Sequence, residues 1–228
     1  MILVRKLLSI YIIIAISSAH VFGQVSVGLQ GGSNLSQMDF TNNPEYKFTE
    51  INYAQGFIGG VVVQFIGDKH AGVQFELNYT QRGWIEMDTI GSNNLKIKNK
   101  MDYLELPILT HINMGSGNFR GVFNLGPYLA YGLNRSITET DENTGASETI
   151  DYTFDSDVDN RLDYGLLVGA GFEYRLKQSK ITAEARYTIG LGDINKDKGV
   201  QSEVSQFRIV ALLVRYTFQL GKKELDPE

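Results

Sequence analysis

Residues 73–80 read Val-Gln-Phe-Glu-Leu-Asn-Tyr-Thr, an unbroken alternation of apolar and polar side chains. Successive side chains of a β-strand point to opposite faces, so this stretch predicts a strand with one apolar and one polar face. The same period of two returns in seven further segments. These segments are residues 25–30, 57–65, 104–112, 119–133, 162–176, 181–191 and 207–220. No segment after residue 23 keeps the spacing of apolar residues that an amphipathic helix requires. The predicted fold class is all-β, an eight-stranded antiparallel transmembrane β-barrel.

The connections between the predicted strands alternate in length. Three are tight turns rich in Gly, Asp or Asn, or are only two residues long: 66–70, 114–118 and 177–178. The other four are long and polar: about 37–54, 85–100, 135–160 and 192–205. Short turns at one end and long loops at the other are typical of outer-membrane barrels, whose short turns lie in the periplasm and whose long loops are extracellular.

The first residues predict export. Arg5 and Lys6 precede the apolar run 7–16, and small residues lead to a predicted cleavage site near Gly23, so residues 1–23 are expected to be a cleaved signal peptide. Residues 24–220 then form the barrel and residues 221–228 a polar periplasmic tail. Removal of the two basic residues changes the net charge from −5 to −7, which argues against a nucleic-acid partner. The chain has no Cys, so it has no disulfide or thiolate metal site.

Charged residues indicate which face of the strands is outside. Every lysine of the mature chain is expected in a turn, a loop, a strand margin or the tail: Lys47, Lys69, Lys96, Lys98, Lys100, Lys177, Lys180, Lys196, Lys198, Lys222 and Lys223. The charges within strands are mostly Glu and Arg on the parity opposite the aliphatic residues. They predict a lumen charge network: Glu76, Arg82, Glu105, Arg120, Glu173, Arg175, Glu184, Arg186 and Arg215. On the lipid face each such charge near the midplane would cost about 2–4 kcal/mol, so the apolar face is expected outside.

Glycines and aromatics are expected to follow the same division. Glycines share the inward parity with Glu and Arg: Gly28, Gly32, Gly56, Gly60, Gly126, Gly165, Gly169 and Gly171. Aromatics near strand ends share the outward parity and predict interfacial girdles: Phe57, Phe65, Tyr131, Tyr164, Tyr174, Tyr187, Tyr216 and Phe218. Leu167 and Gly169 should therefore point inward, and Leu166 and Val168 toward lipid. Eight strands enclose a space that side chains can just fill, so a general diffusion porin is not expected.

Six stretches, in order along the chain, resemble a known family. They are Gly28–Ser36, Val73–Gly83, Tyr103–Leu109, Asn124–Tyr131, Gly165–Tyr174 and Ala183–Gly192. The chain resembles the outer-membrane β-barrel family of Bacteroidetes called PorT-like or "porin family" proteins. The resemblance implies an outer-membrane location and an eight-stranded barrel. Its founding member is tied to a secretion system for surface proteases.

No catalytic, cofactor-binding or metal site is predicted. His111 shares a parity with Glu105, but six residues separate them by roughly 20 Å along a strand. His70 lies in a short turn, and no Ser stands in a recognisable arrangement with either histidine. The acidic segment 139–163 lacks the Gly and Glu offsets of a calcium loop, so a solvated surface loop is expected there.

These features predict a non-enzymatic outer-membrane protein with a polar, side-chain-filled lumen. Its role would be structural, attachment or accessory to protein export, through its external loops. The expected partners are outer-membrane lipid, lipopolysaccharide and other outer-membrane or secretion-system proteins. Two alternatives stay open: a narrow channel or small-solute binding barrel, and a soluble periplasmic lipid carrier with its apolar face inside.

Overall fold

The computed structural model describes residues 24–41, 50–67, 70–90, 93–154, 159–194 and 204–220, which form nine β-strands. The strands are β1 (Gln24–Thr41), β2 (Glu50–Ile66), β3 (Ala71–Ile90), β4 (Asn93–Met114), β5 (Phe119–Asp141), β6 (Ser147–Tyr152), β7 (Leu162–Arg175), β8 (Ser179–Gly190) and β9 (Val204–Leu220). The predicted signal peptide and C-terminal tail lie outside the described residues. Within the described part, no helix is long and apolar enough to cross a membrane.

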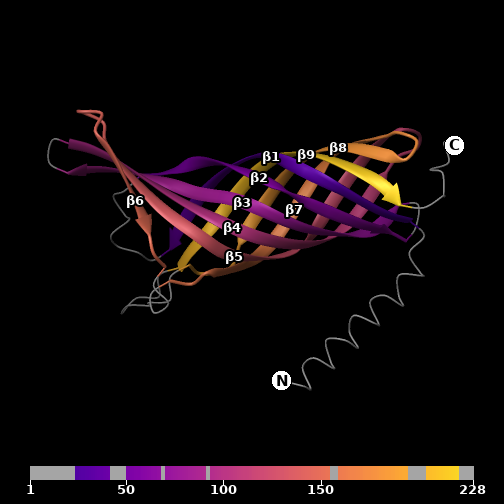
Figure 1. Cartoon of the computed structure of the whole chain (residues 1–228), viewed down its shortest axis with the longest axis horizontal. Coiled ribbons are helices and arrows are strands. Elements are labelled where there is room, and N and C mark those ends of the chain that lie inside the picture. Colours follow the sequence, from indigo (N-terminus) through magenta and orange to yellow (C-terminus); the bar gives the residue numbers. More distant parts are fainter. Residues whose placement is uncertain are drawn as a thin grey trace, which may run out of the picture.

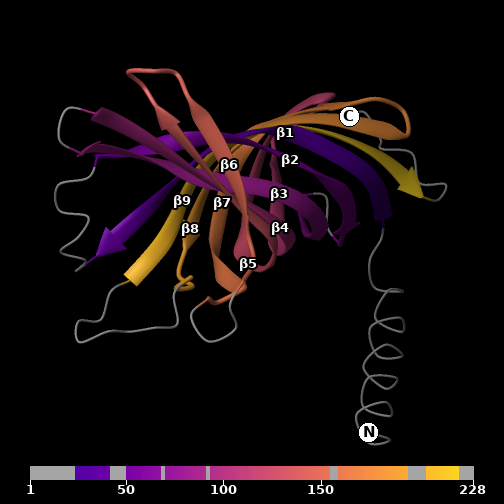
Figure 2. The ribbon, with the colours of Figure 1, turned by 60° about the vertical axis from the view of Figure 1, so that its left-hand side comes forward.

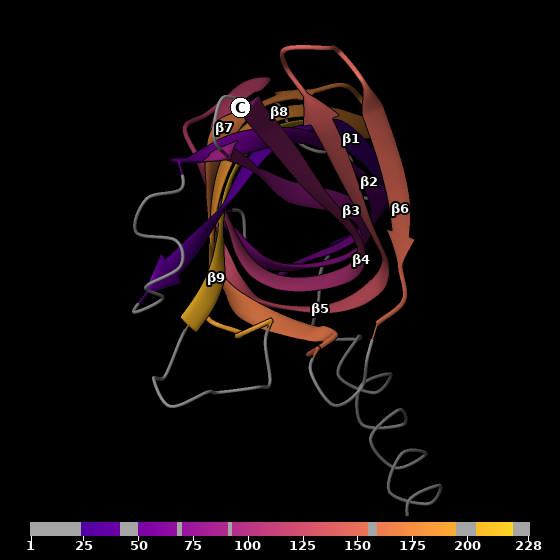
Figure 3. The same ribbon diagram turned by 90° about the vertical axis from the view of Figure 1, so that its left-hand side faces the viewer.

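Eight of the nine strands close into one antiparallel ring (Figures 1 and 3), in the order β1-β2-β3-β4-β5-β7-β8-β9. The ring closes where β9 pairs with β1, from Val25 opposite Leu220 to Thr41 opposite Val204. Strand β6 pairs with the far end of β5, at residues 135–140, and stands outside the ring. The predicted eight-stranded antiparallel barrel is confirmed, and β6 is an addition to it.

The predicted division of faces is also confirmed. Leu166 is 49% exposed on the outside of β7, whereas the next residue, Leu167, is 2% exposed in the lumen. Val168 again faces outward and Gly169 inward. The aromatics predicted for the girdles lie on the outer face, and seven of them are at least 40% exposed: Phe57, Tyr131, Tyr164, Tyr174, Tyr187, Tyr216 and Phe218. An apolar exterior is the arrangement that lipid requires, and it contradicts the lipid-carrier alternative.

The two ends of the barrel differ as the connection lengths predicted. At one end, here the turn end, the β4–β5 turn places Gly115 and Gly117 at φ of 101° and 75°, a region that glycine adopts without strain. The β7–β8 turn closes with a hydrogen bond from the Leu176 N–H to the Ser179 carbonyl, 2.7 Å long. At the opposite end, here the hairpin end, long hairpins project beyond the ring (Figures 1 and 2).

The prediction of loops at 85–100 and 135–160 was wrong in part, because strands continue through much of both segments. Strand β3 runs to Ile90 and β4 begins at Asn93, and β5 runs to Asp141 before β6 returns beside it. The lysines of segment 96–100 therefore lie within β4, and the prediction that such lysines avoid strands was wrong for them. In the β4 extension the outward residues are polar, as at Lys98, whereas Ile97 and Met101 on the other face are apolar, so the apolar-outward pattern of the spanning strands ends while backbone pairing continues.

The difference between the two ends predicts the orientation of the barrel in the outer membrane. An epitope tag inserted at Asn143–Gly145, in the β5–β6 hairpin, should be labelled by antibody on intact cells. A tag at Ser116–Gly117, in the β4–β5 turn, should be labelled only after the outer membrane is permeabilised. Labelling in the reverse order would show that the hairpin end faces the periplasm.

Candidate functional site in the lumen

The middle of the lumen is crossed by four charged side chains, here called the central layer: Glu76, Glu184, Arg186 and Arg215. Arg186 bridges the two carboxylates, with Nη2 2.5 Å from Glu76 Oε1 and Nε 2.6 Å from Glu184 Oε1. Arg215 repeats the bridge, with Nη2 2.9 Å from Glu184 Oε2 and 3.3 Å from Glu76 Oε1. All four side chains are at most 2% exposed. Two negative and two positive groups thus neutralise one another across the barrel.

Amide side chains complete the central layer. Gln30 donates to Glu76 Oε2 over 2.6 Å and accepts from Arg215 Nε over 3.0 Å. Asn78 donates to the same Glu76 oxygen over 2.9 Å, and Asn124 donates to Glu184 Oε2 over 2.8 Å. Burial of a charge is costly unless pairing and hydrogen bonds offset the lost hydration, and these amides supply the remaining bonds.

Two glycines provide the space for this layer. A Cβ at Gly169 would stand 2.1 Å from Glu184 Oε1, and a Cβ at Gly60 would stand 2.2 Å from Asn78 Oδ1. Both positions were predicted to point inward with the charged residues. A larger residue at either position would displace the groups that neutralise the layer.

A second set of charges lies nearer the turn end, here called the turn-side layer: Glu173, Arg175 and Lys180. Arg175 Nε is 2.7 Å from Glu173 Oε1, and Lys180 Nζ is 3.6 Å from Glu173 Oε2. Lys180 is 3% exposed and also donates to Gln64 Oε1 over 2.7 Å. The sequence analysis placed this lysine at a strand margin. Its hydrogen bond to Gln64 was not predicted because the two residues are 116 positions apart.

Hydrogen-bonded glutamines join these two layers. Gln64 donates to Gln74 Oε1 over 2.6 Å, and Gln74 donates in turn to Glu76. Arg215 also donates to Gln74 Oε1 over 3.0 Å. The polar network is therefore continuous from Lys180 to the central layer.

A third set lies nearer the hairpin end, here called the hairpin-side layer: Arg82, Glu105 and Asp163. Arg82 pairs with Glu105, and its Nη1 is 2.7 Å from Asp163 Oδ2. Tyr128 also donates to Asp163 Oδ2, over 2.8 Å. The sequence analysis included Asp163 in an acidic surface loop. Its position between the outward residues Leu162 and Tyr164 is the signal that could have assigned it to the lumen.

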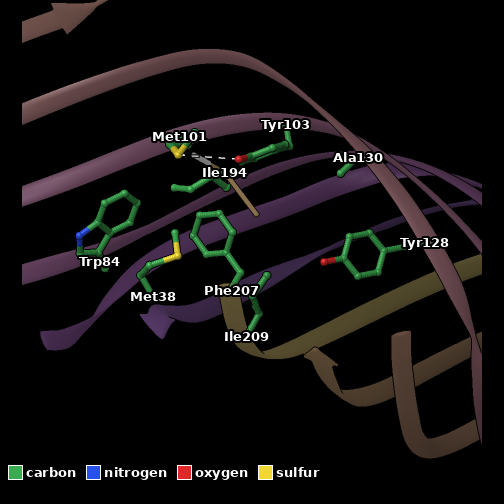
Figure 4. Close-up of a cluster of buried hydrophobic side chains, with 9 residues drawn as sticks. All are labelled: Met38, Trp84, Met101, Tyr103, Tyr128, Ala130, Ile194, Phe207 and Ile209. Atoms are coloured by element: carbon green, nitrogen blue, oxygen red, sulfur yellow. Dashed lines mark hydrogen bonds between the residues drawn. The ribbon is translucent and has the colours of Figure 1, made fainter. Parts of the chain in front are cut away.

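Above this layer the lumen becomes apolar, contrary to the expected polar interior. The buried cluster shown in Figure 4, here called the apolar cap, consists of Met38, Trp84, Met101, Tyr103, Tyr128, Ala130, Ile194, Phe207 and Ile209. The Phe207 ring packs edge-on against Trp84 and Tyr103, with centroids 6.1 and 6.0 Å away. The guanidinium of Arg82 lies 4.8 Å from the Tyr103 ring centroid, so cation–π contacts join the cap to the charges below.

Not every predicted lumen charge joins a layer. Arg120 lies at the turn end, where its Nε donates to the Gly117 carbonyl over 3.1 Å. None of the described carboxylates lies within ion-pair distance of it. The other eight predicted residues divide among the three layers, with Asp163 and Lys180 as the members that the prediction left out.

The residues weighed for acid–base or metal chemistry have other partners. His111 Nδ1 is 2.7 Å from Asn124 Oδ1, and Glu105 pairs with Arg82. Asp159 lies 3.8 Å from Arg135, whereas Asp155 and Asp157 fall outside the described residues. Among the residues that the structure describes, no group of three or more His, Cys, Asp or Glu side chains could hold a metal ion.

Known structures with a similar fold are outer-membrane barrels. OprG from Pseudomonas aeruginosa aligns over 86% of this chain and 96% of its own, with a TM-score of 0.51 and 11% identity. Ail, the attachment invasion locus protein of Yersinia pestis, aligns over 86% and 98%, with a TM-score of 0.41 and 13% identity. Neisserial surface protein A aligns over 85% and 97%, with a TM-score of 0.42 and 12% identity. At these identities the likeness concerns the fold alone.

No curated protein matches the sequence significantly. The family model described as "Outer membrane protein beta-barrel domain" matches residues 17–196, which is more than half of the chain. The closed ring and the apolar exterior agree with that match. This protein of the bacterial outer membrane belongs to the outer membrane protein β-barrel domain family.

Proposed function

We propose that this protein is a closed, non-enzymatic barrel that anchors external hairpins for an attachment or export-accessory role. The observation that carries the proposal is the filled lumen. Arg215 in the central layer, Arg82 in the hairpin-side layer, and Tyr103 and Phe207 in the apolar cap are each less than 2% exposed. Eight strands leave a space that side chains can fill, and here they fill it at successive levels.

The hairpins supply the surface on which such a role would depend. Strands β3, β4 and β5 continue past the ring and β6 pairs with β5 there, so the surface that they carry is held by backbone hydrogen bonds. At the hairpin tip, the Asn143 N–H donates to Asp141 Oδ1 over 2.8 Å, and this bond holds the pKa of the Asp141 carboxyl below its usual value. A rigid scaffold that positions surface segments is a common arrangement for binding.

The finer assignment to the PorT-like barrels of Bacteroidetes is part of this proposal. It rests on the order and spacing of the six sequence motifs. An accessory role in protein export is the part of the proposal that this resemblance favours, whereas attachment is favoured by the projecting hairpins.

A narrow channel or small-solute binding barrel is the second candidate. The turn-side half of the lumen contains buried side-chain atoms without a hydrogen-bond partner among the described residues: His111 Nε2, Asn113 Nδ2 and Oδ1, Thr182 Oγ1 and Thr217 Oγ1. Buried polar atoms of this kind are usually satisfied by water, so this half favours hydration. Conduction would require the central layer, the hairpin-side layer and the apolar cap all to open.

Conductance in planar bilayers separates the two candidates. The wild-type barrel should carry no steady ion current. The variants E184A/R186A and F207A should also stay closed, because each leaves the hairpin-side layer and one further obstruction in place. A steady current through the wild-type protein would establish the channel in place of the closed anchor.

The layer charges should stabilise the barrel through their pairing. Arg82→Met leaves the Glu105 and Asp163 carboxylates buried without their cation, so unfolding should become easier by about 3–5 kcal/mol. Adding Glu105→Gln and Asp163→Asn should recover part of this loss. The matched control is Arg208→Met, whose ion pair with Asp39 is partly exposed and should be worth about 0–1 kcal/mol.

The readout is the temperature at which the folded, fast-migrating band disappears on semi-native gels. If Arg82→Met and Arg208→Met lowered this temperature equally, the buried ion pairs would contribute no more to stability than an exposed one.

Shortening the β5–β6 hairpin tests the external role. Residues 138–149 can be replaced by Asn-Gly, a pair suited to a two-residue hairpin turn. The variant should fold and reach the outer membrane normally, but fail to restore surface attachment or surface-protease export in a deletion strain. If the shortened variant restored both phenotypes fully, the β5–β6 hairpin would have no part in the proposed function.

A further inference from the structure

Three lysines form a column on the outer face of β4 beyond the ring. Asn99 and Met101 point inward and are 3% and 2% exposed, so the alternating Lys96, Lys98 and Lys100 point outward. About 3.3 Å of rise per residue spreads the column over about 13 Å along the strand. It is a local concentration of positive charge on an acidic chain.

Each lysine of the column lies opposite a hydroxyl-bearing residue of β5. Lys96 pairs with Thr140, Lys98 with Thr138, and Lys100 with Ser136.

The hydroxyls continue onto β6. Thr138 Oγ1 is 2.9 Å from Thr149 Oγ1, and Thr140 Oγ1 is 3.1 Å from Ser147 Oγ. The outer faces of β4, β5 and β6 beyond the ring, here called the lysine–hydroxyl face, are therefore one polar surface.

The position of this face relative to the apolar exterior indicates the level of the membrane at which it lies. Farther along β4, the outward residues Leu104, Leu106 and Ile108 are 44%, 45% and 41% exposed and belong to the lipid-facing band. Asp102 is the first outward polar residue above them, and Lys100 follows it. The column therefore begins where the hydrocarbon ends, at the level of the lipid headgroups.

The lysines are not neutralised by nearby side chains. In the described ranges, no carboxylate oxygen lies within 4.0 Å of the three ammonium groups. Asp102 shares the face but accepts a hydrogen bond from Gln81 over 3.0 Å, and Asp151 lies two strands away, opposite Ser136. The positive charge of the column is thus available to an anion outside the barrel.

We infer that the lysine–hydroxyl face binds the phosphorylated sugar headgroup of lipopolysaccharide in the outer leaflet. Ammonium groups bind phosphate as point charges, and the adjacent Ser and Thr hydroxyls can donate to and accept from sugar hydroxyls. The column rises beside the barrel wall, where a neighbouring lipid headgroup stands. The inference rests on the proposed orientation, in which the hairpin end faces outward.

Binding of purified lipopolysaccharide to the full-length mature protein in detergent tests this inference. The triple variant K96Q/K98Q/K100Q should bind about 100-fold more weakly, because each lysine near an anionic membrane surface contributes roughly fivefold. The matched control K177Q/K222Q/K223Q removes the same charge from the turn and tail, and should bind as the wild type does. The variant K96R/K98R/K100R should retain binding.

Two further probes identify the ligand. Lipopolysaccharide stripped of phosphate should bind the wild type weakly, and phosphatidylglycerol should not displace intact lipopolysaccharide. Equal binding by K96Q/K98Q/K100Q and the matched control would overturn the site, and displacement by phosphatidylglycerol would overturn the preference for a sugar headgroup. Binding in detergent depends on neither orientation nor conductance, so these outcomes are distinguishable from failure of the closed-anchor function.

Discussion

The structure depends on one constraint, the need of every backbone polar group in lipid to find a partner within the protein. In hydrocarbon an unpaired N–H or carbonyl costs several kcal/mol, so a strand with a free edge is not tolerated there. Pairing of β1 with β9 over Val25–Thr41 removes the last edges of the ring. Strand β6 pairs with β5 on one side and leaves its other edge open. This strand lies beyond the ring, where water can hydrogen-bond to the backbone groups of that edge. Closure with eight strands then fixes a narrow interior that side chains must fill.

The filling of the interior follows from that closure. The inward parity carries charged groups whose burial is offset by mutual pairing rather than by water. Each guanidinium reaches carboxylates on other strands, as Arg186 does with Glu76 from β8 to β3, so the polar network ties together strands that are not neighbours in the ring. The glycine at position 169 leaves the room that this arrangement needs. Toward the hairpin end the same parity turns apolar, and rings such as Phe207 close the lumen by packing against one another.

Outside the bilayer the constraint relaxes, and the same strands serve another purpose. Backbone pairing persists in β3, β4, β5 and β6, while the outward side chains no longer face lipid and can be polar. The two faces of this extension therefore differ in chemistry, with Trp84 and Met101 turned toward the barrel axis and Lys98 turned away from it. A surface of this kind can be specific without disturbing the spanning part, because its outward side chains take no part in the packing of the lumen.

The sequence by itself determined the spanning strands, their number in the ring and the face that most of their side chains occupy. Alternation is a local property, so residues 73–80 or Leu166 and Leu167 could be assigned without knowing their neighbours. The partners of the lumen charges could not be predicted, because Arg186 and Glu76 are 110 positions apart and their contact depends on closure and strand register. The apolar cap was missed because its residues come from β1, β3, β4, β5, β9 and the segment after β8, so no single stretch of sequence marks it. The hairpin extensions were missed because their outward residues are polar, as at Lys96, Lys98 and Lys100, so the apolar-outward pattern that marked the spanning strands is absent there. Only the tertiary structure decided these features, since register across the ring is set by many strands together.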